Sequence, residues 1–95
     1  MSTFTLQPQN HFAAPYNAVW AGPVTYFVES EFPTTSMVLD GNNLAAFRAG
    51  QRFQFMGRLE NANVHRQTVY IPYRGTWFLV IVNYGTVPTA VHFAV

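Results

Sequence analysis

The sequence predicts an all-β fold, a compact antiparallel β-sandwich of about seven strands with one short helical turn. Short runs of Val, Ile, Thr, Tyr, Phe and Trp alternate with Pro, Gly and Asn along the whole chain. A length of 95 residues allows a single domain, residues 1–95. An apolar content of 49%, with 17% aromatic residues, supplies a core and excludes a disordered chain.

Seven runs have the composition and spacing of strands in a sandwich or barrel. The predicted strands are residues 3–7, 24–30, 36–40, 52–59, 64–71, 76–83 and 89–95. Residues 9–21 show no clean period, and we expect a long loop or an irregular strand there.

Two of these runs predict their surroundings. In residues 52–59, Phe53 and Phe55 alternate with polar residues, which indicates an outer strand with one wet side. Gly57 in the same run suits a bulge or a close approach of another backbone. Residues 77–82 are apolar at both odd and even positions, which predicts a strand covered on both faces, by the core or by another subunit.

One segment has a helical pattern. Leu44, Phe47 and Arg48 follow the i, i+3, i+4 spacing within residues 42–49, and Gly50 comes directly after them. We expect one or two helical turns here, with Asn42 as the N-cap.

Charge is scarce and evenly divided. Charged residues make up 9% of the chain, all five basic residues are arginine, and the net charge is +1. Nucleic-acid binding is therefore not expected, because it needs a clustered positive surface. A weakly charged, aromatic-rich surface favours self-association, and we expect a homodimer or a larger closed assembly.

Other features of the sequence limit the cellular location and the chemistry that we expect of the protein. The chain has no cysteine, so neither a disulfide framework nor thiolate chemistry is available. The longest apolar run, residues 77–82, is far shorter than the roughly 20 residues of a membrane span. The first residues lack a signal-peptide pattern, so we expect a cytoplasmic protein.

The sequence predicts neither a metal site nor a cofactor. His11, His65 and His92 have no zinc-ligand spacing, and we expect isolated imidazoles that are exposed or half-buried. The run from Asp40 lacks the acidic pattern of a calcium loop, whose twelfth position is Gln51 here.

Catalytic patterns are equally weak. The serines lack any activating pattern, and Glu29 and Glu31, on one face of a strand, are expected to be solvated. No constellation supplies the nucleophile, base and orienting group of a hydrolase or NAD-consuming enzyme. We therefore expect a protein that is not an enzyme.

The strongest binding candidates lie on two connections. Pro72 and Gly75 frame a turn that is either an ordinary tight turn or a tip presenting an aromatic ring and a guanidinium to a ligand. With the connection that follows residue 40, this turn supplies the predicted ligand or partner residues. They are Asp40, Asn43, Arg48, Arg52, Tyr73 and Arg74.

Several positions from Met37 onward carry a resemblance. They are Met37, Val38, Leu39, Asp40, Asn43, Phe47, Gly50, Gly57, Ile71, Pro72, Gly75 and Trp77 with its apolar run. In this pattern the chain resembles the DUF1883 family, a bacterial domain of unknown function. It departs from the family at Met56-Gly57, where a paired glycine is usual, and at Val82-Asn83, where an aspartate tends to end the Trp strand.

The resemblance implies a compact β-sandwich, sometimes joined to TIR domains in bacterial proteins that look like defence effectors, and it implies no catalytic residue. We therefore expect a binding or sensing module for a small molecule or protein partner, linked to bacterial defence signalling. The alternative is a self-assembling structural component of a phage or secretion-system particle.

Overall fold

The computed structural model describes residues 2–95 as six strands and one helix. In chain order these are β1 (Ser2–Leu6), β2 (His11–Ala18), β3 (Gly22–Asp40), α1 (Gly41–Arg48), β4 (Met56–Ile71), β5 (Gly75–Val82) and β6 (Thr89–Ala94). All strand pairings are antiparallel. The predicted all-β fold with one short helix is therefore confirmed.

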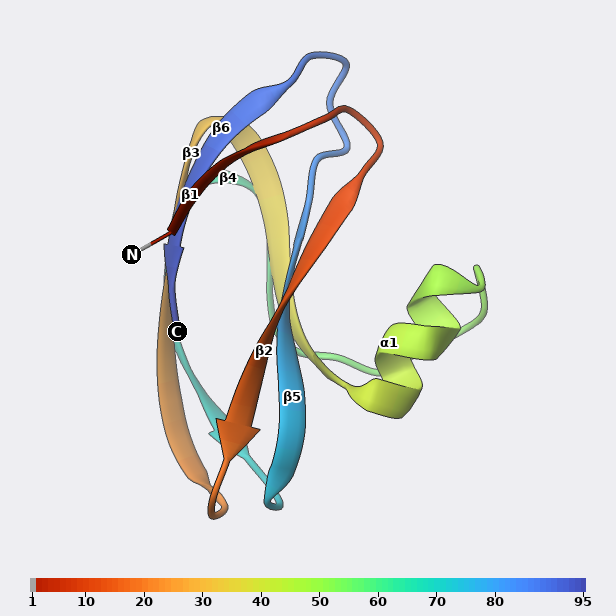
Figure 1. Ribbon diagram of the computed structural model, residues 1–95, viewed down its shortest axis with the longest axis vertical. Coiled ribbons are helices and arrows are strands. Elements are labelled where there is room, and N and C mark those ends of the chain that lie inside the picture. The colour runs from red at the N-terminus through yellow and green to blue at the C-terminus, as the bar shows by residue number, and fades with distance from the viewer. Residues whose placement is uncertain (1) are drawn as a thin grey trace.

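Two long strands, β3 and β4, run through both layers of the fold (Figure 1). Residues 22–30 of β3 pair with β6 and with the end of β4, and β1 extends this layer beyond β6. Residues 34–40 of β3 pair with β5 and with the start of β4, and β2 extends the second layer beyond β5. The β3–β4 register shifts between Glu29 and Thr34, which is how bulged strands turn a corner between sheets.

This continuity corrects the predicted strand count. The runs 24–30 and 36–40 are two halves of β3, and the run 64–71 is the second half of β4. The chain bends at Phe32-Pro33, where alternation is lost although the strand continues. The break in the alternation between residues 30 and 36 is therefore a bend within one strand and not a turn between two strands.

Residues 9–21 contain a strand, which was one of the two alternatives expected there, and residues 52–55 differ from the predicted strand 52–59. β2 occupies most of the first segment, in register with β5 along its whole length. It tolerates Pro15 because β2 is an edge strand, where a missing N–H costs no sheet hydrogen bond. Residues 51–55 are not a strand, since Phe53 instead packs on Phe47 of α1, with ring centroids 5.2 Å apart.

The core has two parts because the second layer is covered on both faces. Between the layers, Trp77, Leu79 and Ile81 of β5 pack with Tyr26, Val28 and Val91 of the first layer. On the outer face of β5, Val80 and Val82 pack with Leu44 of α1. The prediction that residues 77–82 are covered on both faces is confirmed, and the cover is a helix of the same chain.

Helix α1 begins at Gly41, and its N-cap lies two residues earlier than expected. Asp40, and not Asn42, is the N-cap, and its Oδ1 accepts hydrogen bonds from Asn43 N at 2.8 Å and Asn43 Nδ2 at 2.9 Å. Gly50, with φ of +69°, follows the C-cap residue Ala49 as predicted.

Gly57 is closely approached, as its position predicts, but by side chains and not by another backbone. Its φ is +57°, and a Cβ placed there would collide with Val69 Cγ1 and Gln67 Nε2. We expect Gly57→Ala to lower the free energy of unfolding by about 2 kcal/mol or more, measured by urea denaturation. Gly41→Ala is the matched control, since nothing lies within 4 Å of its added Cβ, and it should stay within about 0.5 kcal/mol. Equal stability of the two variants would contradict this account of Gly57.

Candidate functional site

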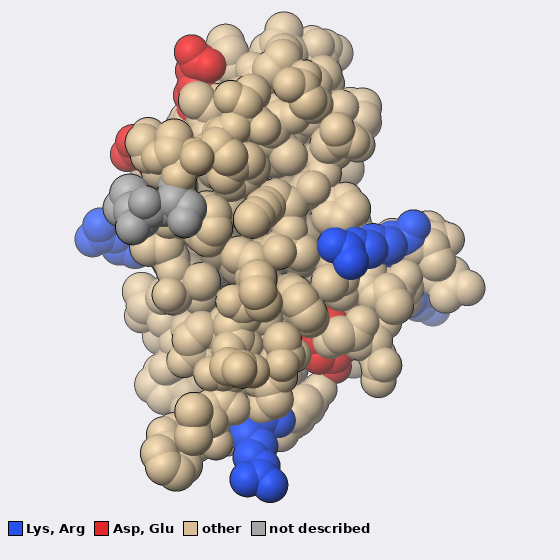
Figure 2. Space-filling view, in the orientation of Figure 1, with Lys and Arg blue, Asp and Glu red and all other residues tan. Residues whose placement is uncertain are grey.

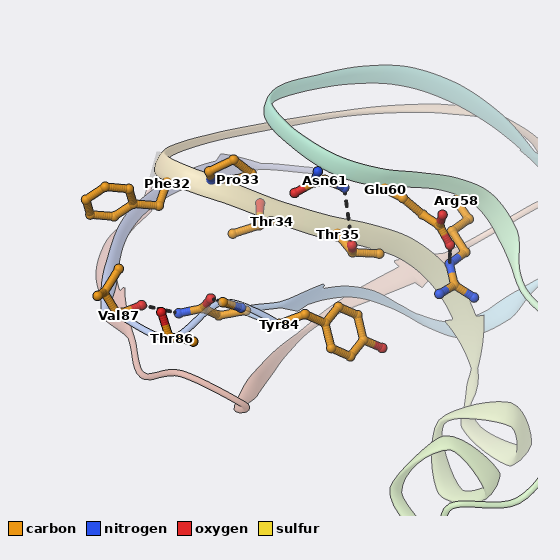
Figure 3. A pocket seen from close by; sticks show the side chains of 12 residues that line it. Phe32, Pro33, Thr34, Thr35, Arg58, Glu60, Asn61, Tyr84, Thr86 and Val87 are labelled. Atoms are coloured by element: carbon orange, nitrogen blue, oxygen red, sulfur yellow. Dashed lines mark hydrogen bonds and ion pairs between the residues drawn. The ribbon is translucent and has the colours of Figure 1, made fainter.

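A cleft of about 520 Å³ lies beside the bend of β3, and we call it the corner cleft. Figure 3 shows it between two walls, with Thr34 and Thr35 on β3 facing Tyr84 and Thr86 on the β5–β6 connection. The start of β4 contributes the rim. This volume falls in the range of about 300–1,000 Å³ that is typical of small-molecule sites.

The β5–β6 wall of the corner cleft is held in place by Asn83. Its Nδ2 donates to the carbonyls of Leu6 at 3.0 Å and Val87 at 2.9 Å, and its Oδ1 accepts from Gly85 N at 2.9 Å. Gln9 adds to this anchor, because its Nε2 donates to the carbonyls of Tyr84 and Gly85, each at 3.0 Å. An aspartate at position 83 has no side-chain N–H and could not donate to the carbonyls of Leu6 and Val87.

The lining of the corner cleft is amphipathic. Phe32 is 44% exposed and Tyr84 is 52% exposed, so both rings offer free apolar surface. On the rim, Arg58 Nε lies 3.0 Å from Glu60 Oε1, as an ion pair in which the N–H does not point at an acceptor within the described residues. The face shown in Figure 2 is largely uncharged, with basic and acidic side chains scattered over it.

Behind the cleft lies a chain of buried polar groups. Tyr26 Oη is 2.8 Å from Ser36 Oγ, Ser36 Oγ is 2.6 Å from His65 Nδ1, and His65 Nε2 is 2.8 Å from the carbonyl of Ala62. A carbonyl only accepts, so Nε2 carries the proton and Nδ1 accepts from Ser36. Burial lowers the pKa of His65, which favours this neutral form.

The Ser36–His65 contact resembles the pair that activates a nucleophile, but its burial is that of a structural group. Both side chains are 0% exposed, so a substrate cannot reach Ser36 Oγ. The expectation of exposed or half-buried imidazoles is therefore wrong for His65. The strand period could have shown this, because His65 shares the parity of the buried Val69 and Ile71.

Three of the six predicted binding residues come together in a second, smaller pocket of about 170 Å³. Tyr73 Oη donates to Asp40 Oδ2 at 2.6 Å, and Asn43 donates to Asp40 Oδ1. The hydrogen bond from Tyr73 and then the one from the Asn43 backbone lower the pKa of Asp40, whereas the Asp40 carboxylate raises the pKa of Tyr73.

The three predicted arginines lie outside the linings of both pockets. Arg48 Nε donates to His11 Nε2 at 3.1 Å, across from α1 to β2. Arg52 and Arg74 are exposed on connections. Sequence analysis missed the corner cleft itself, since Phe32, Tyr84 and Thr86 belong to no recognisable motif and meet only through the fold.

Comparisons with known proteins add no family. No protein-family model matches the chain, and a search of curated proteins finds no match. Within residues 2–95 no three His, Cys, Asp or Glu side chains gather as metal ligands. In the same part of the chain, no helix has the length and hydropathy needed to cross a bilayer.

The buried His65 makes stability depend on pH. Because its pKa in the folded protein lies below the ordinary value of 6.5, the unfolded chain binds more protons as pH falls below 6.5. Stability should therefore be level above about pH 7 and fall as the pH drops below about 6.5, by up to about 1.4 kcal/mol per pH unit for each titrating histidine. Urea denaturation at a series of pH values measures this slope.

Two variants show which histidine causes the dependence of stability on pH. Burial and the nearby Arg48 charge lower the pKa of His11 too, so His11→Gln removes its share and should leave the remaining slope in place. His65→Gln should flatten that remaining slope. A slope unchanged by His65→Gln would show that His65 does not titrate as the structure requires.

Proposed function

We propose that the protein is a non-enzymatic binding module and that the corner cleft holds its small-molecule ligand. The observation that carries this proposal is a cleft of about 520 Å³ whose β5–β6 wall is anchored by hydrogen bonds from Asn83 and Gln9. A wall fixed before binding reduces the ordering cost of association.

The lining favours an uncharged ligand with one apolar face and several hydroxyl groups, such as a sugar or nucleoside. Phe32 and Tyr84 supply ring surface for an apolar face, while Asn61 and Thr86 supply neutral hydrogen-bonding groups. The ion pair of Arg58 with Glu60 balances the one positive charge of the lining, so an anionic ligand gains no free counterion there.

Binding is favoured over glycoside hydrolysis by the number of carboxylates. Most glycosidases use two carboxylates on either side of the scissile bond. Glu60 is the one acid in the described lining of the corner cleft. On the resemblance to DUF1883, we extend the proposal to a sensing role in the bacterial cytoplasm, linked to defence signalling.

Ligand screening tests the corner cleft. Titration of labelled protein with uncharged sugars and nucleosides should shift amide resonances of residues 83–87 and of Thr34 and Thr35, and raise the melting temperature. Tyr84→Ala should weaken binding about 10-fold, because it removes a stacking surface worth about 1.4 kcal/mol.

Tyr70→Ala is the matched control for this loss. Tyr70 is 62% exposed, comparable with Tyr84, but lies on β4 outside the corner-cleft lining. We expect its affinity to equal that of the unaltered protein. Equal losses in both variants, or resonance shifts confined to other surfaces, would refute the corner cleft as the site.

A second candidate function is self-assembly, which the turn between β2 and β3 favours. Trp20 is 80% exposed and its neighbour Val19 is 65% exposed. Large aromatic side chains are enriched where protein interfaces concentrate their binding energy, and an unburied one at a tip is typical of a contact surface.

Light scattering tests self-assembly. We expect a dimer or larger assembly at high micromolar concentration, and Trp20→Ser should shift it toward monomer without changing the melting temperature of the monomer. Val64→Ser is the control, since Val64 is also exposed but lies on β4. A clean monomer at that concentration would contradict this candidate.

A further inference from the structure

The second pocket, which we call the aromatic pocket, combines three rings with one carboxylate. Phe55, Tyr73, Trp77 and Asp40 all line its volume of about 170 Å³. None of its lining residues belongs to the lining of the corner cleft. The two pockets are therefore separate sites.

Tyr73 and Phe55 keep free ring surface, whereas Trp77 is 4% exposed and belongs to the core. Tyr73 and Trp77 have ring centroids 5.0 Å apart and planes tilted by 46°. The indole N–H of Trp77 donates to the carbonyl of Tyr73 at 3.1 Å, which ties the turn to the core. Phe55 is 46% exposed and Tyr73 52% exposed, so their faces are open to a ligand. The faces of aromatic rings attract cations.

The carboxylate in this pocket has no positive counterion. Its hydrogen-bond donors are the Tyr73 hydroxyl at 2.6 Å and the backbone and side-chain amides of Asn43, all of them neutral. Within residues 2–95, Asp40 forms no ion pair at 4 Å or less. Together these donors lower the pKa of Asp40, so the group is ionised at neutral pH.

The occupied lone pairs of Asp40 select the type of cation. Oδ1 already accepts two hydrogen bonds and Oδ2 accepts one, so little capacity remains for a metal ion or for an ammonium group that must donate several hydrogen bonds. A methylated ammonium has no such requirement. It is attracted through charge and through the ring faces alone.

A cation already binds one of these rings from within the chain. The guanidinium carbon of Arg58 lies 5.2 Å from the centroid of Phe55, and Glu60 pairs with that guanidinium at 3.0 Å. The ion pair limits repulsion of a second cation in the aromatic pocket, because Arg58 and Glu60 together carry no net charge.

We propose that the aromatic pocket binds a small quaternary ammonium compound such as choline, with Asp40 as counterion and with Tyr73 and Phe55 as ring contacts. This site is independent of the ligand proposed for the corner cleft. The pocket is smaller than the usual range for drug-sized ligands, which restricts it to a compact trimethylammonium group.

An NMR titration with choline tests the proposal against dimethylbutanol, the uncharged carbon analogue of the same shape. Choline should shift the amide resonances of Asp40, Asn43, Phe55 and Tyr73 and saturate in the millimolar range. The neutral analogue should bind at least about 5-fold more weakly, because it loses both the charge and the cation–π attraction. Equal affinities would overturn the proposal.

Variants separate the counterion from general electrostatics. Asp40→Asn should weaken choline binding at least about 5-fold and leave the fold intact, because asparagine also caps helices well. Tyr73→Phe keeps the ring and should change the affinity less than about 3-fold. Glu29→Gln removes the same charge from an exposed position of β3 outside the pocket and should have no effect. Unchanged binding in Asp40→Asn, or an equal loss in Glu29→Gln, would overturn the assignment.

Discussion

The bend shared by β3 and β4 is the constraint on which the rest of the structure depends. Two strands that pass from one layer to the other break their own ladder at the corner, where buried polar groups still need partners. Tyr26, Ser36 and His65 form a hydrogen-bonded chain there that ends on the carbonyl of Ala62. A fully satisfied network of this kind fixes one geometry for the corner, and with it the distance between the two layers.

Both pockets follow from that corner and from the two-sided cover of β5. The corner cleft opens where β3 leaves the first layer, so one of its walls is made by Thr34 and Thr35. The aromatic pocket lies at the other end of the same half-strand, where Asp40 ends β3 and pairs with Trp77 of β5. Asp40 thus serves the helix and the pocket together, as N-cap on one oxygen and as partner of Tyr73 on the other.

Sequence analysis predicts well what depends on local pattern. The alternation of apolar and polar side chains located most strand segments. Apolar residues at both odd and even positions of residues 77–82 predicted that this strand is covered on both faces. Of the six residues predicted to bind a ligand or partner, Asp40, Asn43 and Tyr73 line one pocket and the three arginines do not, and their role in binding stays a prediction. Sequence analysis failed where pairing between distant segments determines the structure. β2 contains Pro15 and is recognisable as a regular strand only from its pairing with β5. A single bent strand such as β3 shows the same alternation of side chains as two separate strands. Tyr84 and Phe32 form a cleft only after the chain has folded, so no spacing along the chain could show it.

Gln9 influences the shape of the corner cleft from outside its lining. It adopts a left-handed backbone, with φ of 64°, in the turn between β1 and β2, and does not line the corner cleft. Yet its side-chain amide holds two carbonyls of the opposite turn, including that of Tyr84. A glutamine that does not line the corner cleft therefore helps to fix the position of one of its walls, and exchange of Gln9 would alter the shape of the cleft without changing any residue of its lining.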